Sequence, residues 1–119
     1  MLFRVDHASP VPLGDQIAAS VRGALADGSV RPGERLPAAR AVAESLGVNV
    51  HTVLRGYQRL KDEGLIDLRR GRGAVVTGQA TPARARLTER VGQLVTEART
   101  LGLTDEEVVA MVRSGLSVG

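Results

Sequence analysis

The residues in this chain best suited to chemistry are arginines that follow one another closely. The segment Arg69-Arg70-Gly71-Arg72-Gly73 places three arginines within four positions, and its glycines allow close approach of a backbone. Because three neighbouring guanidinium groups repel one another, the cluster favours binding to an anion. A guanidinium group can donate two hydrogen bonds at once to a phosphate or to a guanine edge. The segment predicts a nucleic-acid contact, with a solvated basic hairpin as the alternative.

A second polar cluster lies on a predicted helix over residues 50–63, whose two faces differ in character at about 100° per residue. The face expected in the core is apolar and carries Val53, Tyr57 and Leu60. The opposite face is polar and carries His51, Arg55 and Gln58, with Val50 and Leu54 on its flank. Guanidinium and amide groups match guanine and adenine edges, and the aliphatic pair matches a thymine methyl group. A solvated helix face would carry the same polar residues.

Three residues near helix starts have more than one interpretation. Asn49 caps the helix that follows it, reads a base, or does both. Thr52 caps, packs or contacts a phosphate. Arg40, near the start of a shorter helix, is placed to clamp a phosphate with the help of the helix N-terminus.

The elements that must position these residues can be predicted from periodicity and from helix-ending glycines. A first helix is expected over residues 12–27, and a shorter one opens at Pro37 and ends at Leu46 before Gly47. After the third helix, residues 65–68 and 74–77 resemble two strands joined by the arginine-rich segment. The order helix, helix, tight turn, helix, hairpin is that of a winged helix-turn-helix. We therefore expect a mainly α fold with a small β-hairpin wing.

The last forty residues have a different character, and we expect two domains, a DNA-binding domain over 1–79 and a two-helix dimerisation segment over 80–119. Thr104 and Glu107 have the spacing of a capping box at the start of the final helix. Two amphipathic helices cannot bury their apolar faces alone, so they must pack on the winged domain or on a second copy. The residues expected at a dimer interface are Leu87, Val91, Leu94, Val95, Leu101, Val108 and Val112.

Composition excludes several classes of function. The chain has no cysteine, and its two histidines, His7 and His51, have no acidic residue at ligand spacing, so we expect no metal, no cofactor and no enzymatic activity. Phe3 and Tyr57 are the only aromatic residues, which disfavours single-strand binding by base stacking. Residues 1–79 hold eleven basic and eight acidic side chains, a net charge of +3 that favours duplex DNA as the partner. No secretory signal or membrane span is present, so we expect a cytoplasmic protein.

Several motifs in order resemble the GntR family of bacterial transcription regulators, over roughly residues 10–77. They are Gly33–Arg40, similar to that family's P-G-x-x-L-P-S-x-R-x-L-A signature, then Leu46–Val53, Tyr57–Leu60, Glu63–Ile66, and Gly71–Val76, similar to its G-R-G-T-F/Y-V wing. The short two-helix tail resembles the YtrA-type subfamily, which lacks a large effector domain. The resemblance implies a sequence-specific DNA-binding regulator, most simply a repressor that acts as a homodimer on a palindromic operator.

By position, the resemblance implies that Arg40 contacts DNA, that residues 49–52 begin the recognition helix and that Arg72 reads a base at the wing tip. Ala38 stands where a serine is usual, and Val50 and Leu54 stand where many members have polar readers. These differences imply more thymine-methyl contact and fewer guanine contacts. A protein-interaction module and a non-specific architectural DNA binder are the alternative functions. The residues expected to touch DNA are Arg40, Asn49, Val50, His51, Thr52, Arg55, Gln58, Arg70, Gly71 and Arg72.

Overall fold

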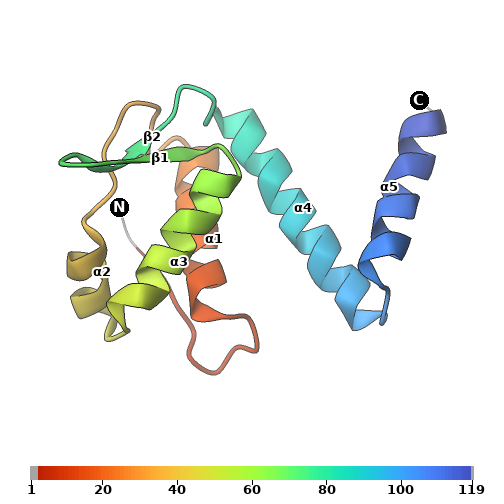
Figure 1. The fold of residues 1–119 in the computed structure, drawn as a ribbon, viewed down its shortest axis with the longest axis horizontal. Coiled ribbons are helices and arrows are strands. Elements are labelled where there is room, and N and C mark those ends of the chain that lie inside the picture. The colour runs from red at the N-terminus through yellow and green to blue at the C-terminus, as the bar shows by residue number, and fades with distance from the viewer. Residues whose placement is uncertain (1–2, 119) are drawn as a thin grey trace. The chain divides into compact units, whose positions relative to one another are not determined.

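The structure, a computed structural model, describes residues 3–118. Within them the chain forms, in order, α1 (Leu13–Ala26), α2 (Ala39–Leu46), α3 (Val50–Asp62), β1 (Ile66–Arg69), β2 (Gly73–Val76), α4 (Pro82–Thr100) and α5 (Asp105–Val118) (Figure 1). This order confirms the predicted fold class, a winged helix-turn-helix followed by two helices.

Helix α2 begins later than the sequence predicts. The prediction that Pro37 opens the helix is wrong, since the first helical residue is Ala39. The Leu36 N–H donates a 2.9 Å hydrogen bond to the carbonyl of Ala74, and this bond holds the chain before Pro37 extended beside β2. The end of α2 is as predicted, because Gly47 adopts a left-handed φ of 67°. The strands are each shifted by one residue from the predicted 65–68 and 74–77.

The chain divides between Thr88 and Glu89 into two compact units. In the first unit, α1 and α2 both pack on α3, and β1 contacts the end of α3. Ala80 and Ala85, before and within the first turn of α4, are buried in the same core. The division of function at residue 80 stays a prediction. The largest fully buried side chains of the core are Ile17, Val21, Leu25, Val53, Leu60, Leu65 and Ile66.

The hairpin of the first unit is widened by a third extended segment. Strands β1 and β2 are antiparallel, with Ile66 opposite Val76 and Arg69 opposite Gly73. On the other edge of β2, Arg35 forms an antiparallel bridge with Val75. We refer to residues 66–76 as the wing. The wing is therefore anchored on both edges, by α3 through β1 and by residues 33–36 through β2.

The second unit contains the rest of α4 and all of α5. The predicted capping box is confirmed, because the Thr104 N–H donates to Glu107 Oε1 at 3.1 Å and the Glu107 N–H donates to Thr104 Oγ1 at 3.2 Å. No described residue of α5 is buried. In the part of the chain that the structure describes, no helix is long and apolar enough to cross a membrane.

Candidate nucleic-acid interface

Helix α3 presents one apolar and one polar face, as its sequence predicts. Val53, Tyr57 and Leu60 are all at most 2% exposed, and they anchor the helix in the core. His51, Arg55 and Gln58 are exposed on the other side, together with Leu54 on the flank. The Gln58 Nε2 donates a 3.0 Å hydrogen bond to Asp62 Oδ1 one turn later. This contact uses one of the two N–H donors of the Gln58 amide, which leaves its other N–H and its Oε1 available to a base.

The start of α3 is held by Asn49, which acts as the helix cap. Its Oδ1 accepts a 2.8 Å hydrogen bond from the His51 N–H. The Asn49 side chain is exposed, and its Nδ2 donates no hydrogen bond among residues 3–118. One residue can therefore cap the helix with its oxygen and still offer its amide group to a ligand. Val50 and Thr52, which follow, are half-buried.

The position of α3 is set by a close contact with α1 at two glycines. A Cβ atom added to Gly56 would lie 2.7 Å from the Gly14 carbonyl oxygen, and one added to Gly14 would lie 3.2 Å from the Thr52 carbonyl oxygen. Our sequence interpretation identified neither glycine as a packing contact. The signal was present at Gly56, because a glycine inside a helix costs about 1 kcal/mol and often marks a close packing contact.

A buried ion pair fixes the other end of α3 to α1. Arg22 donates from Nε and Nη2 to the two carboxylate oxygens of Glu63, both at 2.8 Å. The Arg22 side chain is 8% exposed and the Glu63 side chain 18%. Arg59 adds a weaker contact to the same carboxylate at 3.3 Å. We did not predict this pair from the sequence, because its two residues are 41 positions apart and meet only when α1 packs on α3.

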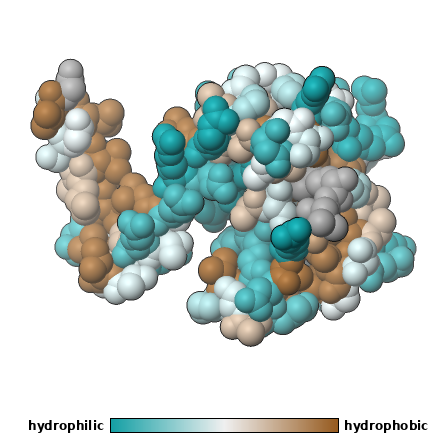
Figure 2. All heavy atoms as spheres, turned by 180° about the vertical axis from the view of Figure 1, so that it is seen from behind, coloured by the Kyte–Doolittle hydropathy of each residue, from teal (hydrophilic) through white to brown (hydrophobic). Residues whose placement is uncertain are grey.

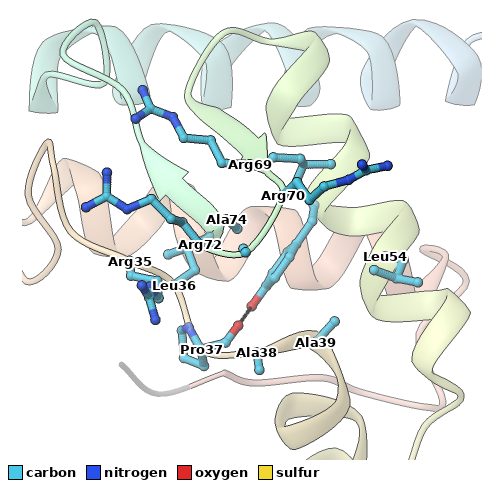
Figure 3. A pocket seen from close by; sticks show the side chains of 14 residues that line it. Arg35, Leu36, Pro37, Ala38, Ala39, Leu54, Arg69, Arg70, Arg72 and Ala74 are labelled. Carbon is cyan, nitrogen blue, oxygen red and sulfur yellow. Dashed lines mark hydrogen bonds between the residues drawn. The ribbon is translucent and has the colours of Figure 1, made fainter.

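A hydrogen bond between Tyr57 and Pro37 joins α3 to the segment before α2. The Tyr57 hydroxyl donates to the Pro37 carbonyl oxygen at 2.6 Å (dashed line in Figure 3). Burial raises the pKa of the Tyr57 phenol to about 12. The phenol is thus neutral at physiological pH and remains a hydrogen-bond donor.

The tip of the wing is shaped by two left-handed glycines. Gly71 has a φ of 80° and Gly73 a φ of 72°, left-handed values that favour glycine, and the Arg72 N–H donates to the Arg69 carbonyl at 3.1 Å. The turn leaves Arg69, Arg70 and Arg72 exposed. Arg69 contacts Asp67 Oδ2 at 3.4 Å, whereas Arg70 and Arg72 have no ion-pair partner among the described residues.

A groove of about 600 Å³ lies between the wing, α3 and the start of α2. Its floor includes Leu54 and Leu68, which are 44% and 39% exposed, and no acidic residue lines it. In Figure 3 the Arg70 side chain extends toward α3, while Arg35, Arg69 and Arg72 lie on the other side of the groove. We call this the wing groove. It combines exposed aliphatic groups with unneutralised cations, which matches the sugars, methyl groups and phosphates of a nucleic acid.

Of the ten predicted DNA-contacting residues, three line the wing groove, and six others lie at the start of, or on, helix α3 beside it. Arg70, Gly71 and Arg72 line it, and Leu54 connects it to the exposed face of α3. Arg40 is exposed in the first turn of α2 and does not line the groove. Our sequence interpretation missed Arg35 and Leu68, whose place depends on the pairing of residues 33–36 with β2.

The predicted interface residues of the C-terminal segment are partly or fully exposed. Leu94, Val95 and Val108 are half-buried in one protomer. The others are exposed, namely Leu87, Val91, Leu101 and Val112. Further large hydrophobic side chains are exposed on α5, which are Val109, Met111, Leu116 and Val118. Figure 2 shows hydrophobic residues gathered over this helix.

Between residues 3 and 118, no group of three histidine or acidic side chains is arranged to hold an ion.

Proteins of similar sequence and structure are transcription regulators. The family described as "Bacterial regulatory proteins, gntR family" matches residues 13–76. HTH-type transcriptional regulator Rv1152 of Mycobacterium tuberculosis is 34% identical over 90% of this chain and 88% of its own length. HTH-type transcriptional repressor YtrA of Bacillus subtilis is 30% identical over 90% and 86%. The solved structure of YtrA from Sulfolobus acidocaldarius, a GntR-family transcription factor, is 32% identical with a TM-score of 0.60 and covers 96% of both chains.

Proposed function

The chain belongs to the GntR family of bacterial regulatory proteins, as a DNA-binding transcription regulator of the YtrA type, and on this basis we propose that it is a homodimeric repressor of a palindromic operator. Members of this family regulate transcription by binding DNA and are not enzymes. The repressor role is supported by the name of the B. subtilis relative. We propose that the protein is cytoplasmic and that it associates with the nucleoid when it is bound to DNA.

The single observation that carries the proposal is the wing groove next to the polar face of α3. Phosphate contacts set the position of a protein on DNA, and base edges supply sequence specificity. The arginines of the wing suit the first task and the exposed face of α3 suits the second. The residues that we propose touch DNA are Arg40, Asn49, Val50, His51, Thr52, Arg55, Gln58, Arg70, Gly71 and Arg72.

Within that set, different side chains suit different parts of the operator. Arg55 has the two donors that match guanine, and the free N–H and the Oε1 of Gln58 match adenine. Val50 and Leu54 suit the methyl group of thymine. Arg72, between two glycines at the wing tip, suits a narrow minor groove, where the negative potential is strongest.

The proposed dimer is supported by the apolar side chains of α4 and α5 that one protomer leaves exposed. A helix pair with such faces gains stability by burying them against another surface. We assign residues 80–119 to dimerisation and residues 1–79 to DNA binding. Two winged domains related by a two-fold axis read a palindrome, and the second half-site is then bound at a high effective concentration.

Fluorescence anisotropy tests the proposal. The full chain is titrated against a labelled duplex from upstream of its own gene and against a scrambled duplex, at two salt concentrations. Preference for the promoter that persists as salt rises supports base readout. Equal binding to both duplexes that falls steeply with salt indicates an architectural binder that contacts only phosphates. Absence of binding to either duplex favours a protein-interaction module.

A further inference from the structure

Arg35 lies outside both the helix-turn-helix and the hairpin, yet it belongs to the same sheet as the wing. Its backbone pairs with Val75 in an antiparallel bridge. Three hydrogen bonds surround this bridge, from the Gly33 N–H to the Val76 carbonyl at 2.9 Å, from the Val76 N–H to the Glu34 carbonyl at 2.8 Å and from the Leu36 N–H to Ala74. The backbone on both sides of Arg35 is therefore fixed to β2 by hydrogen bonds.

The register of the sheet determines where the Arg35 side chain points. Leu36 is 3% exposed and faces the core, so its neighbour Arg35 faces outward, because successive side chains alternate between the two faces. Residues directly opposite in a sheet share a face, which places Arg35, Val75 and Asp67 on the same outer face. In Figure 3 Arg35 lies on the side of the wing groove that holds Arg69 and Arg72.

The charge on this side is balanced only in part, by the carboxylate of Asp67. Asp67 contacts Arg69 at 3.4 Å, but Arg35 and Arg72 have no ion-pair partner among residues 3–118. All three arginines line the wing groove, whose lining contains no acidic residue. Unpaired guanidinium groups that lie close together repel each other unless an anion lies between them or beside them.

We propose that Arg35 binds a DNA phosphate and extends the protein–DNA contact beyond the wing. Arg70 faces α3 on one side of the wing, while Arg35, on the side that holds Arg72, contacts the sugar–phosphate backbone on the outer flank of each half-site. This inference rests on the proposed function and deepens it. Because phosphate contacts carry no sequence information, Arg35 contributes affinity and salt dependence but no sequence preference.

The test compares Arg35→Ala with Arg31→Ala, a matched control. Arg31 is an exposed arginine of the same segment that does not line the wing groove, so both variants lose one positive charge. We expect Arg35→Ala to weaken binding to promoter and scrambled duplexes alike, by about tenfold per protomer. The slope of log K against log salt should fall by about 0.9 per protomer. Arg35→Lys, which keeps the charge, should restore most of that slope.

Each other outcome overturns the inference in a recognisable way. If Arg35→Ala binds like the wild type, or no more weakly than Arg31→Ala, Arg35 contacts no phosphate. If Arg35→Ala loses binding to the promoter alone, the residue reads a base instead. In both cases the wild type still prefers its promoter, so the proposed function stands. If the wild type binds neither duplex, the proposed function and this inference fail together. Equal melting temperatures of the variants show that the fold is intact.

Discussion

The Tyr57 hydroxyl donates a 2.6 Å hydrogen bond to the Pro37 carbonyl, and this bond joins α3 to the chain that leads into α2. Tyr57 is 2% exposed, so its ring also fills the space between the two helices. Pro37 is half-buried, and its carbonyl oxygen loses this hydrogen-bond partner when the phenol no longer donates. The spacing between α2 and α3 therefore depends on a phenol that stays protonated.

The protonation of Tyr57 predicts a loss of stability at high pH. Burial raises its pKa from about 10 to about 12, so the folded state holds the phenol proton more tightly than the unfolded state does. The resulting stabilisation is fully present below pH 10 and is lost as the pH rises toward 12. Since Tyr57 is the only tyrosine, absorbance at 295 nm reports its ionisation directly, and we expect a midpoint near 12 in the folded protein.

The Tyr57→Phe variant serves as the control for this titration. At pH 8 it should be less stable than the wild type by about 1 kcal/mol in urea unfolding, because the Pro37 carbonyl loses its partner. Between pH 10 and 12 it should lose less stability than the wild type. Parallel pH profiles for the two proteins would contradict the assignment.

The contact between Gly14 and Gly56 predicts that Gly56 tolerates no side chain. In Gly56→Ala the new Cβ meets the Gly14 carbonyl oxygen at 2.7 Å, and α1 must move away. We expect a loss of about 1–3 kcal/mol in urea unfolding. Gly23→Ala is the matched control, because that α1 position has no atom within 4 Å of an added Cβ. It should gain about 0.5–1 kcal/mol from helix propensity. Equal stability changes in the two variants would exclude the close contact.

The Arg22–Glu63 pair predicts strong coupling between α1 and the end of α3. Removing one partner leaves a charge that is mostly shielded from water, so Arg22→Met and Glu63→Gln should each cost about 2 kcal/mol. The double variant should cost less than the sum, since neither charge is then left alone. Urea unfolding of the four proteins gives the coupling energy. If the losses of the two single variants simply add, the interaction between Arg22 and Glu63 contributes nothing to the free energy of unfolding.

Sequence predicted those features that are set by neighbouring residues. The apolar face of Val53, Tyr57 and Leu60, the Asn49 cap and the capping box of α5 all depend on residues within two turns of one another. The features that we did not predict from the sequence depend on pairing between segments that are distant in the chain. The place of Arg35 in the sheet requires residues 33–36 to meet β2, and the Arg22–Glu63 pair requires α1 to meet the end of α3. The late start of α2 has the same cause, because Leu36 is held by Ala74.

Substitution of Arg72 should change DNA affinity through the loss of its hydrogen-bond geometry as well as its charge. If its guanidinium contacts a base, Arg72→Ala should weaken promoter binding by about 1–3 kcal/mol and reduce the preference over a scrambled duplex. Arg72→Lys should not restore that preference, because an ammonium group lacks the planar pair of donors. Anisotropy titrations of both variants at one salt concentration measure this. Unchanged affinity of Arg72→Ala would remove the residue from the interface.

The exposed apolar face of α5 predicts a variant that folds but does not dimerise. Val112 is 45% exposed in the protomer, so Val112→Glu should leave the melting of the winged domain unchanged. In a dimer the new carboxylate would be buried without a partner, at a cost of several kcal/mol by the general penalty for buried charges. Sedimentation at tens of micromolar should therefore find wild-type dimers and Val112→Glu monomers.

The matched control for Val112 is Ser114→Glu, which adds the same charge to the same helix. Ser114 lies about 160° from Val112 around α5 and is exposed, so this variant should still form dimers. Because a monomer engages one half-site at a time, Val112→Glu should also bind a full operator no more tightly than a single half-site. A wild-type chain that sediments as a monomer, or a Val112→Glu chain that remains a dimer, would show that this face of α5 is not the interface.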